Sequence, residues 1–152
     1  MKIPVNINIT KKTLPELKRI RACDNADGDE YVSDYEGTMT IVKNEIKLNY
    51  IDHDNVSVEE TIRDGKCRFL TISAAGRVMA SLAFEQGKSF ICYFPTGEHA
   101  DFVRIDTKKF ESFLTKDGGY IYVEYLSEVP EYGAERYELT MRISPTGKFL
   151  RS

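Results

Sequence analysis

The sequence predicts an all-β protein, folded as a single up-and-down antiparallel β-barrel of about 8–10 strands over residues 1–152. Apolar residues recur at every second position through most of the chain, which is typical of strands with one buried face. Turn-forming residues interrupt this alternation roughly every 8–12 residues. So many short strands cannot lie in one flat sheet, because twist accumulates and the edges stay unpaired. Closure into a barrel removes the edges.

The individual strands follow from the alternation, in chain order. The apolar runs that predict strands cover residues 3–9, 31–41, 46–50, 56–62, 70–72, 78–84, 90–94, 121–125 and 137–143. Between the runs lie residues that tolerate a positive φ: Lys43-Asn44, Asp64-Gly65, Ala75-Gly76, Gln86-Gly87 and Asp117-Gly118-Gly119. Short turns of this kind favour pairing between neighbours in the sequence, which is the pattern of an up-and-down barrel.

Two segments break the alternation. Within residues 11–29, Leu14, Leu17 and Ile20 have helical spacing, and Thr13 precedes Glu16 by the three residues of a capping box. We therefore expect a short helix or loop insertion near the N-terminus. Residues 108–116 fit one helical turn and a strand equally well, so both interpretations stay open there.

The composition indicates a cytoplasmic protein without a membrane span. The net charge is −3 and charged residues make up 30% of the chain. Asn6 and Asn8 interrupt the apolar run that a secretory signal would need. The three cysteines, Cys23, Cys67 and Cys92, contain no CxxC pair, which favours free thiols in a reducing compartment.

No motif in the chain predicts a cofactor, a metal site or a catalytic group. The chain has only two histidines, His53 and His99, too few for a multi-histidine metal site, and neither has the spacing of a nucleophile–base pair. The basic run within residues 11–21 lacks Phe and Tyr and is followed directly by an acidic run, so we expect no nucleic-acid partner. Binding is therefore a better prediction than catalysis.

Two charged residues stand on faces that are otherwise apolar. Glu60 alternates with Val58 and Ile62, and Arg68 alternates with Leu70. A tight hairpin joins the two strands, so we expect both charged side chains to face inward and nearly opposite each other. Three interpretations remain open. The first is an ion pair at the barrel mouth that satisfies only itself, and the second is a pair at the ligand entrance that holds the polar end of an apolar guest. The third is a hairpin bulge that turns either residue outward.

Tyrosines also occupy inward positions of the alternation. They are Tyr35, Tyr50, Tyr125 and Tyr137. A tyrosine on an inner face either fills volume and hydrogen-bonds through its hydroxyl group, or lines a cavity.

Short motifs follow one another in a fixed order along most of the chain. They are Tyr50-Ile51-Asp52, Thr61-Ile62, Gly76 before Val78, Leu82-Ala83-Phe84-Glu85-Gln86-Gly87, Phe94-Pro95-Thr96, Ile105-Asp106-Thr107 and Gly119-Tyr120-Ile121-Tyr122-Val123-Glu124-Tyr125. In this order and spacing the chain resembles the YwiB-like family of small bacterial proteins. The resemblance implies a calycin-type barrel, as in lipocalins and streptavidin, with a ligand-sized interior, and it implies no activity. Asp52 stands where the family has Glu.

These observations lead to one preferred function and two alternatives. The preferred hypothesis is a non-catalytic barrel that binds a small amphipathic molecule at its interior or mouth, through Tyr35, Tyr50, Asp52, Glu60, Arg68 and Tyr125. The first alternative is a homodimeric interaction module with an outer apolar patch of Ile91, Tyr93, Val103, Ile105, Tyr120 and Tyr122. The second is a lipocalin-like lyase or isomerase that works by enclosure.

Overall fold

The fold is known from a computed structural model that describes residues 1–14, 30–95, 101–130 and 133–147. The described chain forms ten strands and no helix. The strands are β1 (Lys2–Leu14), β2 (Glu30–Val42), β3 (Glu45–Ile51), β4 (Ser57–Arg63), β5 (Lys66–Ile72), β6 (Val78–Glu85), β7 (Ser89–Tyr93), β8 (Phe102–Thr115), β9 (Gly118–Val129) and β10 (Gly133–Pro145). Within these ranges, no helix is long and apolar enough to cross a membrane.

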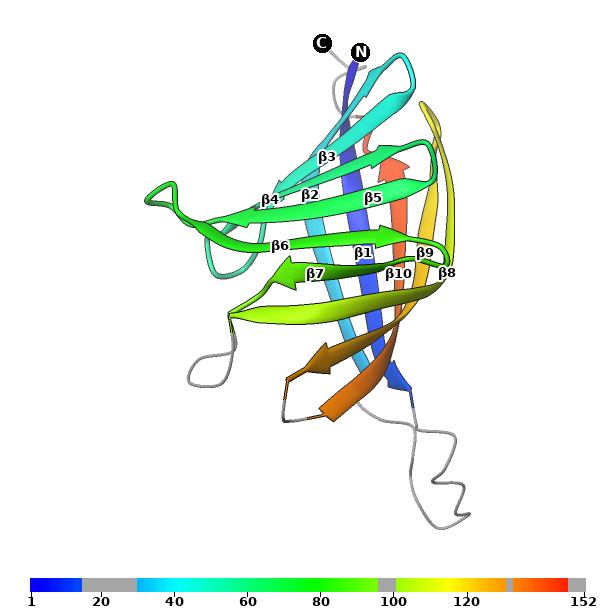
Figure 1. Ribbon diagram of the computed structural model, residues 1–152. Coiled ribbons are helices and arrows are strands. Elements are labelled where there is room, and N and C mark those ends of the chain that lie inside the picture. Colours follow the sequence, from blue (N-terminus) through cyan, green and yellow to red (C-terminus); the bar gives the residue numbers. More distant parts are fainter. Residues whose placement is uncertain (15–29, 96–100, 131–132, 148–152) are drawn as a thin grey trace.

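The ten strands close into one antiparallel barrel. Each strand pairs with its neighbours in the sequence, and β1 closes the barrel by pairing with both β2 and β10. Ile7 illustrates the closure, because it lies opposite Tyr35 on one side and Ile143 on the other. Figure 1 shows the long strands β1, β2 and β10 running together, while β4 to β7 cross them at a steep angle. The predicted fold class is confirmed.

The barrel interior is a packed core over much of its length. Its fully buried side chains include Val5, Ile7, Met39, Leu48, Ile121, Val123 and Met141. These residues lie on the faces that the alternation predicted to be inward. Each such side chain contributes roughly 1.5–3 kcal/mol to stability by leaving water, and all of them except Leu48 come from the long strands β1, β2, β9 and β10.

The two segments that broke the alternation have different outcomes. Thr13 and Leu14 belong to strand β1, where they lie opposite Tyr137 and Arg136 of β10, so the helix start expected at Thr13 is wrong. Leu17 and Ile20 lie outside the described residues. Residues 108–115 are strand, within β8.

A β-bulge in β8 reverses the face of its first half. Thr107 lies opposite Tyr125 while Lys109 lies opposite Glu124, so Lys108 is the extra residue. The bulge puts Val103 and Ile105 inside the barrel, where each is 1% exposed.

The predicted outer apolar patch is therefore wrong at Val103 and Ile105, which pack against the interior instead. Of the other four members, Ile91 and Tyr120 are exposed, and Tyr93 and Tyr122 are half-buried. A patch that loses its central strand is not continuous across β8.

Candidate functional site

The interior opens at one end into a small pocket, which we call the mouth pocket. Its volume is about 240 Å³, and its lining consists of Tyr35, Tyr50, Asp52, Val58, Phe69, Thr71, Ala80, Leu82 and Phe94. Seven of these side chains come from inward positions of β2 to β6, and Asp52 and Phe94 follow the ends of β3 and β7. The pocket is thus mainly apolar, with a few polar groups at its edge.

Stacked aromatic rings form one wall of the mouth pocket. The ring centroids of Tyr35 and Tyr50 lie 4.8 Å apart, with an angle of 27° between the ring planes. The ring centroid of His53 lies 4.8 Å from that of Tyr35. Burial, together with the nearby Glu60 carboxyl group, raises the pKa of Tyr50 well above its usual value. The Tyr50 hydroxyl therefore stays neutral and available as a donor at every physiological pH.

Asp52 has a structural task beside its place in the pocket. Its Oδ1 atom accepts hydrogen bonds from the backbone N–H groups of Asp54 (2.9 Å) and Val56 (3.0 Å). The carboxylate thus holds the turn between β3 and β4 in an Asx-type arrangement. This fixes one oxygen of Asp52 in position at the pocket edge.

Glu60 is fully buried in the interior, at 0% exposure, facing the same side of β4 as Val58 and Ile62. The Cys67 thiol donates a hydrogen bond of 2.9 Å to its Oε2 atom, and within the described residues its Oε1 atom has no partner. Burial raises the Glu60 pKa to about 8, and the Cys67 hydrogen bond opposes this only in part. Glu60 is therefore a neutral carboxylic acid at pH 7.

Arg68 does not join Glu60, and its predicted inward position is wrong. Asp64 and Gly65 both have positive φ, 49° and 77°, and form a two-residue turn in which Arg63 lies opposite Lys66. This register places Glu60 opposite Phe69, and Arg68 opposite Thr61 on the outer face. The predicted ion pair is absent because the turn makes Cys67 and Phe69, not Arg68, the inward residues of β5.

Tyr125 lies deeper in the core, away from the mouth pocket. It is buried, and its ring contacts Phe84 and Tyr137 at centroid distances of 4.9 and 5.4 Å. This is the packing of a core residue.

The six predicted site residues therefore separate into three groups. Tyr35, Tyr50 and Asp52 line the mouth pocket; Glu60 and Tyr125 are interior residues outside its lining; Arg68 is on the outer wall. The alternation of apolar residues did not indicate Phe69 and Thr71 as lining residues. The Asp64-Gly65 turn could have indicated them, because a two-residue turn fixes which residues of β4 and β5 share a face.

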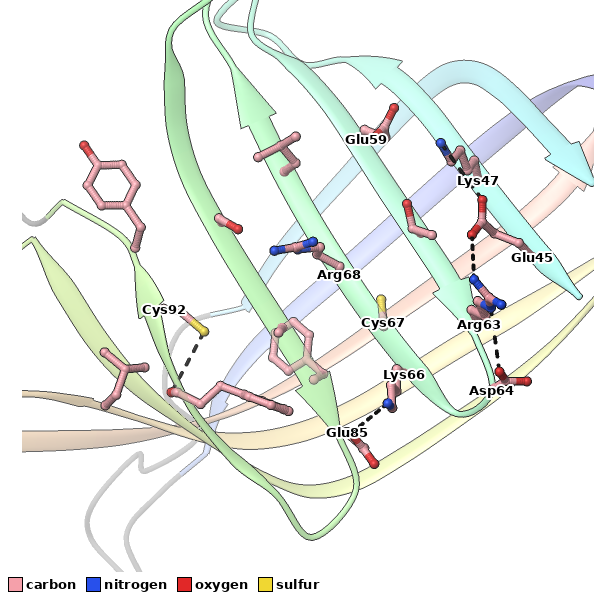
Figure 2. Close-up of a pocket in the computed structure, with 18 of the residues that line it drawn as sticks. Glu45, Lys47, Glu59, Arg63, Asp64, Lys66, Cys67, Arg68, Glu85 and Cys92 are labelled. Atoms are coloured by element: carbon pink, nitrogen blue, oxygen red, sulfur yellow. Dashed lines mark hydrogen bonds and ion pairs between the residues drawn. The ribbon is translucent and has the colours of Figure 1, made fainter.

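A second and larger hollow lies on the outer wall, from β3 to the start of β8. This outer groove has a volume of about 1150 Å³ and includes Arg68, Leu70, Ser81, Ala83, Ile91, Tyr93 and Phe102 in its lining (Figure 2). Ion pairs occupy its rim: Arg63 with Glu45 (4.0 Å) and Asp64 (3.7 Å), Lys47 with Glu45 (4.0 Å), and Lys66 with Glu85 (4.0 Å).

The wall below the outer groove contains the weakest strand pairing of the barrel. Only Ser81 and Tyr93 form a residue pair between β6 and β7 among the described residues. At the other end of this seam, Thr107 of β8 bonds directly to the end of β6 and to the turn that follows it. Its Oγ1 accepts a hydrogen bond from the Glu85 N–H (3.3 Å), and its carbonyl accepts one from the Gly87 N–H (2.9 Å). The bulge in β8 thus closes a gap that β7 is too short to fill.

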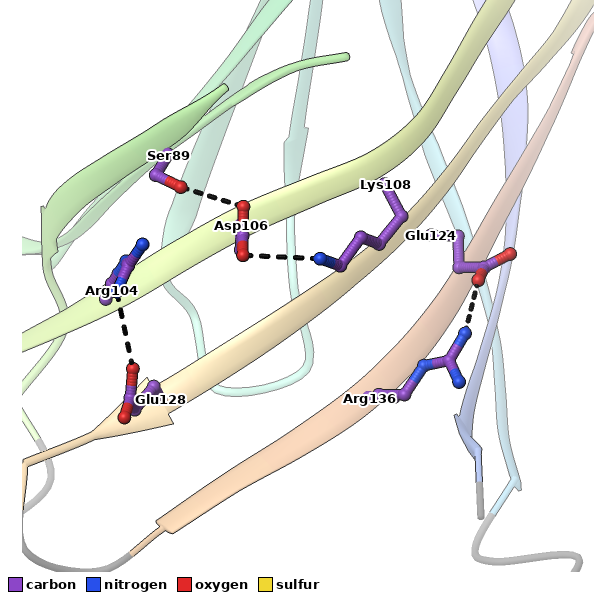
Figure 3. A network of polar contacts seen from close by, with 7 residues as sticks. All are labelled: Ser89, Arg104, Asp106, Lys108, Glu124, Glu128 and Arg136. Carbon is purple, nitrogen blue, oxygen red and sulfur yellow. Dashed lines mark hydrogen bonds and ion pairs between the residues drawn. The ribbon is translucent and has the colours of Figure 1, made fainter. Parts of the chain in front are cut away.

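The outer face of β7 to β10 is different, because its charges neutralise one another. Asp106 accepts hydrogen bonds from Ser89 (2.7 Å) and Lys108 (3.4 Å), and these contacts hold its pKa below the usual value (Figure 3). Nearby, Arg136 pairs with Glu124 at 2.7 Å, and Arg104 pairs with Glu128 at 3.9 Å. The exposed Arg104–Glu128 pair contributes little stability, and none of these paired groups offers an unpaired charge to a ligand.

A closed antiparallel barrel of ten strands, with a packed core and a pocket at one end of its interior, defines an up-and-down β-barrel protein. The chain belongs to the family described as "Domain of unknown function (DUF1934)", whose sequence pattern matches residues 17–141. The ywiB protein from Bacillus subtilis, known from a crystal structure, has the same fold with a TM-score of 0.73. The two chains are 15% identical over 95% of this chain and 92% of that one.

The comparisons confirm the resemblance to the YwiB-like family, and at this identity the solved structure shows the fold alone. No curated protein matches the chain.

Proposed function

We propose that this protein binds a small molecule in the mouth pocket without transforming it. The observation that carries the proposal is the pocket itself: an interior hollow with stacked Tyr35 and Tyr50 on one side, Phe69 and Phe94 also in its lining, and the Asp52 carboxylate at its edge. Sites for small molecules are typically concave and mainly apolar, with a few placed polar groups that orient the ligand.

The size and lining of the pocket define the class of ligand. At about 240 Å³ the pocket is smaller than the 300–1,000 Å³ typical of drug-sized ligands. It therefore suits a compact molecule with one flat or branched apolar part, which packs against the tyrosine stack. The polar end of such a ligand faces Asp52 and the neutral hydroxyl of Tyr50, which accept and donate hydrogen bonds respectively.

The structure offers less support to the dimer hypothesis. That hypothesis relied on an outer patch in which Val103 and Ile105 were central, and both residues are buried. For a lyase or isomerase, a pocket residue would have to exchange a proton with the substrate. Glu60, the residue with the most suitable pKa, is not part of the pocket lining.

Binding in the mouth pocket is tested by fragment screening with two-dimensional NMR on the isotope-labelled protein. We expect compact amphipathic fragments to shift the amide signals of Tyr35, Tyr50 and Phe94. Phe94→Ala should weaken binding several-fold, because the Phe94 ring is part of the apolar lining of the pocket. Phe113→Ala is the matched control, since Phe113 is an exposed aromatic residue outside the lining. A complete screen without shifts at the mouth, or equal losses from both variants, would exclude the proposal.

A further inference from the structure

The outer groove is a second hollow whose chemistry the mouth pocket does not explain. We propose that it binds a small organic anion, in which a carboxylate lies next to a bulky apolar group. The anion's carboxylate would bind Arg68 and its apolar group would lie against Ile91, Tyr93 and Phe102. This inference goes beyond the proposed function, because Arg68 faces away from the interior and the two hollows have no lining residue in common.

The charge pattern of the outer groove selects an anion. Arg63, Lys47 and Lys66 each have a carboxylate partner within 4.0 Å. Arg68 lines the same groove, is exposed, and makes no hydrogen bond or ion pair with any residue that the structure describes. A guanidinium group binds a carboxylate through two parallel hydrogen bonds, which makes Arg68 the natural anchor for this group.

The Arg68 side chain points into the outer groove. Figure 2 shows its side chain extending from β5 toward β6 and Cys92. Burial raises the pKa of the Cys92 thiol, and an N–H of Ala83 and the positive charge of Arg68 act against that rise, as expected for a guanidinium on this side of β5. The guanidinium thus lies near the seam between β6 and β7.

Small side chains make the groove hollow at this seam. Ser81 and Ala83 are half-buried groove-lining residues of β6, and they lie between the larger Arg68 and Leu70 of β5 and Tyr93 of β7. Cross-strand neighbours on one face lie about 5 Å apart. A strand with short side chains between two strands with long ones therefore forms a trough.

The far side of the trough is apolar and exposed. Ile91 is 71% exposed and Phe102 is 52% exposed, and Tyr93 packs edge-on against Phe102 with a centroid distance of 5.7 Å. Exposed apolar side chains that cluster beside a polar group are typical of binding sites. Because Arg68 and this cluster lie on opposite sides of the trough, a ligand must be charged at one end and apolar at the other.

Glu59 sets the orientation of the ligand. It lines the groove on β4, opposite Leu70, and like Arg68 it has no ion pair with the described residues. An apolar group on the β4 side would cover the Glu59 carboxylate and remove it from water, which is costly. The apolar end of the ligand therefore points away from β4, toward β7. The negative charge of Glu59 also repels the ligand's carboxylate and so weakens binding.

The test uses 2-naphthoate as the probe and its neutral analogue 2-naphthamide as the matched control ligand, with NMR titration of the full chain. We expect naphthoate to shift the signals of Arg68, Ser81, Ile91 and Phe102, and naphthamide to bind at least about ten-fold more weakly. Arg68→Gln should lower naphthoate affinity by a similar factor. Arg63→Gln, a cation on the same rim that is already paired, should change it less than about two-fold. Glu59→Gln should strengthen binding.

Four results would overturn the proposal. They are equal binding of the amide and the carboxylate, an Arg68→Gln affinity equal to that of the wild type, no naphthoate shifts at millimolar concentration, and shifts confined to Tyr35 and Tyr50. The last result would assign the probe to the mouth pocket and leave the proposed function intact. A fifth result, sedimentation that shows a dimer lost in Arg68→Gln, would also overturn the proposal, because it would assign the groove to a second copy of the chain.

Discussion

Glu60 shows how one buried side chain acquires unusual chemistry from its surroundings. Its carboxyl group is fully enclosed, has the Cys67 thiol as its donor, and lies opposite Leu48 and Phe69 rather than a cation. An ionised carboxylate in this place would carry a large desolvation cost without a counter-charge. The group therefore stays protonated, with a pKa of about 8.

The raised pKa makes stability depend on pH in a definite direction. Between about pH 4.5 and 8 the unfolded chain has lost the Glu60 proton while the native protein keeps it, so the free energy of unfolding falls as the pH rises. The stabilisation that comes from the raised Glu60 pKa is fully present below pH 4.5 and is completely lost above pH 8.

Glu60→Gln keeps the shape of the neutral acid and removes the titration. Urea unfolding at pH 5 and pH 7 measures the effect. Between these pH values the free energy of unfolding of the wild type should fall by about 2–3 kcal/mol more than that of the variant, at roughly 1.4 kcal/mol per pH unit. Glu59→Gln is the matched control, since Glu59 is only half-buried on the other face of β4, and it should keep the wild-type dependence. If the free energy of unfolding changed equally with pH in the wild type and in Glu60→Gln, Glu60 would be ionised in the native protein.

At the scale of single elements, strand β2 approaches β3 unusually closely at Gly37. Gly37 lies opposite Tyr50, and a Cβ atom on it would meet the carbonyl oxygen of Asn49 and lie 2.9 Å from the Tyr50 Cβ. The absence of a side chain here lets Tyr50 stack on Tyr35. The mouth pocket therefore depends on one glycine in the middle of a strand, although glycine normally weakens strands.

Gly37→Val tests this close approach. We expect the variant to lose about 2 kcal/mol or more of stability, because the new side chain forces β2 and β3 apart. The amide signals of Tyr35 and Tyr50 should move more than those of β9 and β10. Thr38→Val serves as the control on the neighbouring position, which faces the other side of β2, and should be nearly neutral. A fully stable Gly37→Val protein with an unchanged tyrosine stack would contradict the structure.

At the scale of the whole molecule, β1 is the strand that turns a sheet into a barrel. It pairs with β2 from Lys2 to Lys12 and with β10 from Val5 to Leu14. Without it, β2 and β10 would be long edge strands, which are templates for aggregation. The stability of the barrel as a unit therefore depends on the inward face of β1.

Two substitutions on β1 test whether its inner face, and not its outer face, determines the stability of the barrel. Ile7→Asp places a charge at a fully buried position between β2 and β10, and should cost about 4 kcal/mol or more, enough to abolish a cooperative thermal transition and cause aggregation. Thr10→Asp, at a half-buried position of opposite parity, should leave a cooperative transition in place. Circular dichroism and light scattering during heating measure both effects. Equal tolerance of the two changes would mean that β1 does not close the barrel.

Alternation could predict the long strands because each has one apolar and one polar face. In β1, β9 and β10 this made the inward residues unambiguous. It could not resolve β5, where Leu70 and Ile72 on one face compete with Cys67 and Phe69 on the other. The choice there depends on the register imposed by the Asp64-Gly65 turn. The same limit applies to β8, where one extra residue at Lys108 reverses the pattern.

The sequence by itself determined the barrel class, because period-two hydrophobicity and turn residues are local signals. The order of its short motifs indicated the family by resemblance. Only the tertiary structure decided that Glu60 and Arg68 are separated by the wall. The physical reason is that a side chain's face depends on cross-strand register, which turns and bulges set at a distance from the residue. The predicted ion pair thus became two separate features: a neutral acid in the core, and an unpaired cation in a groove outside it.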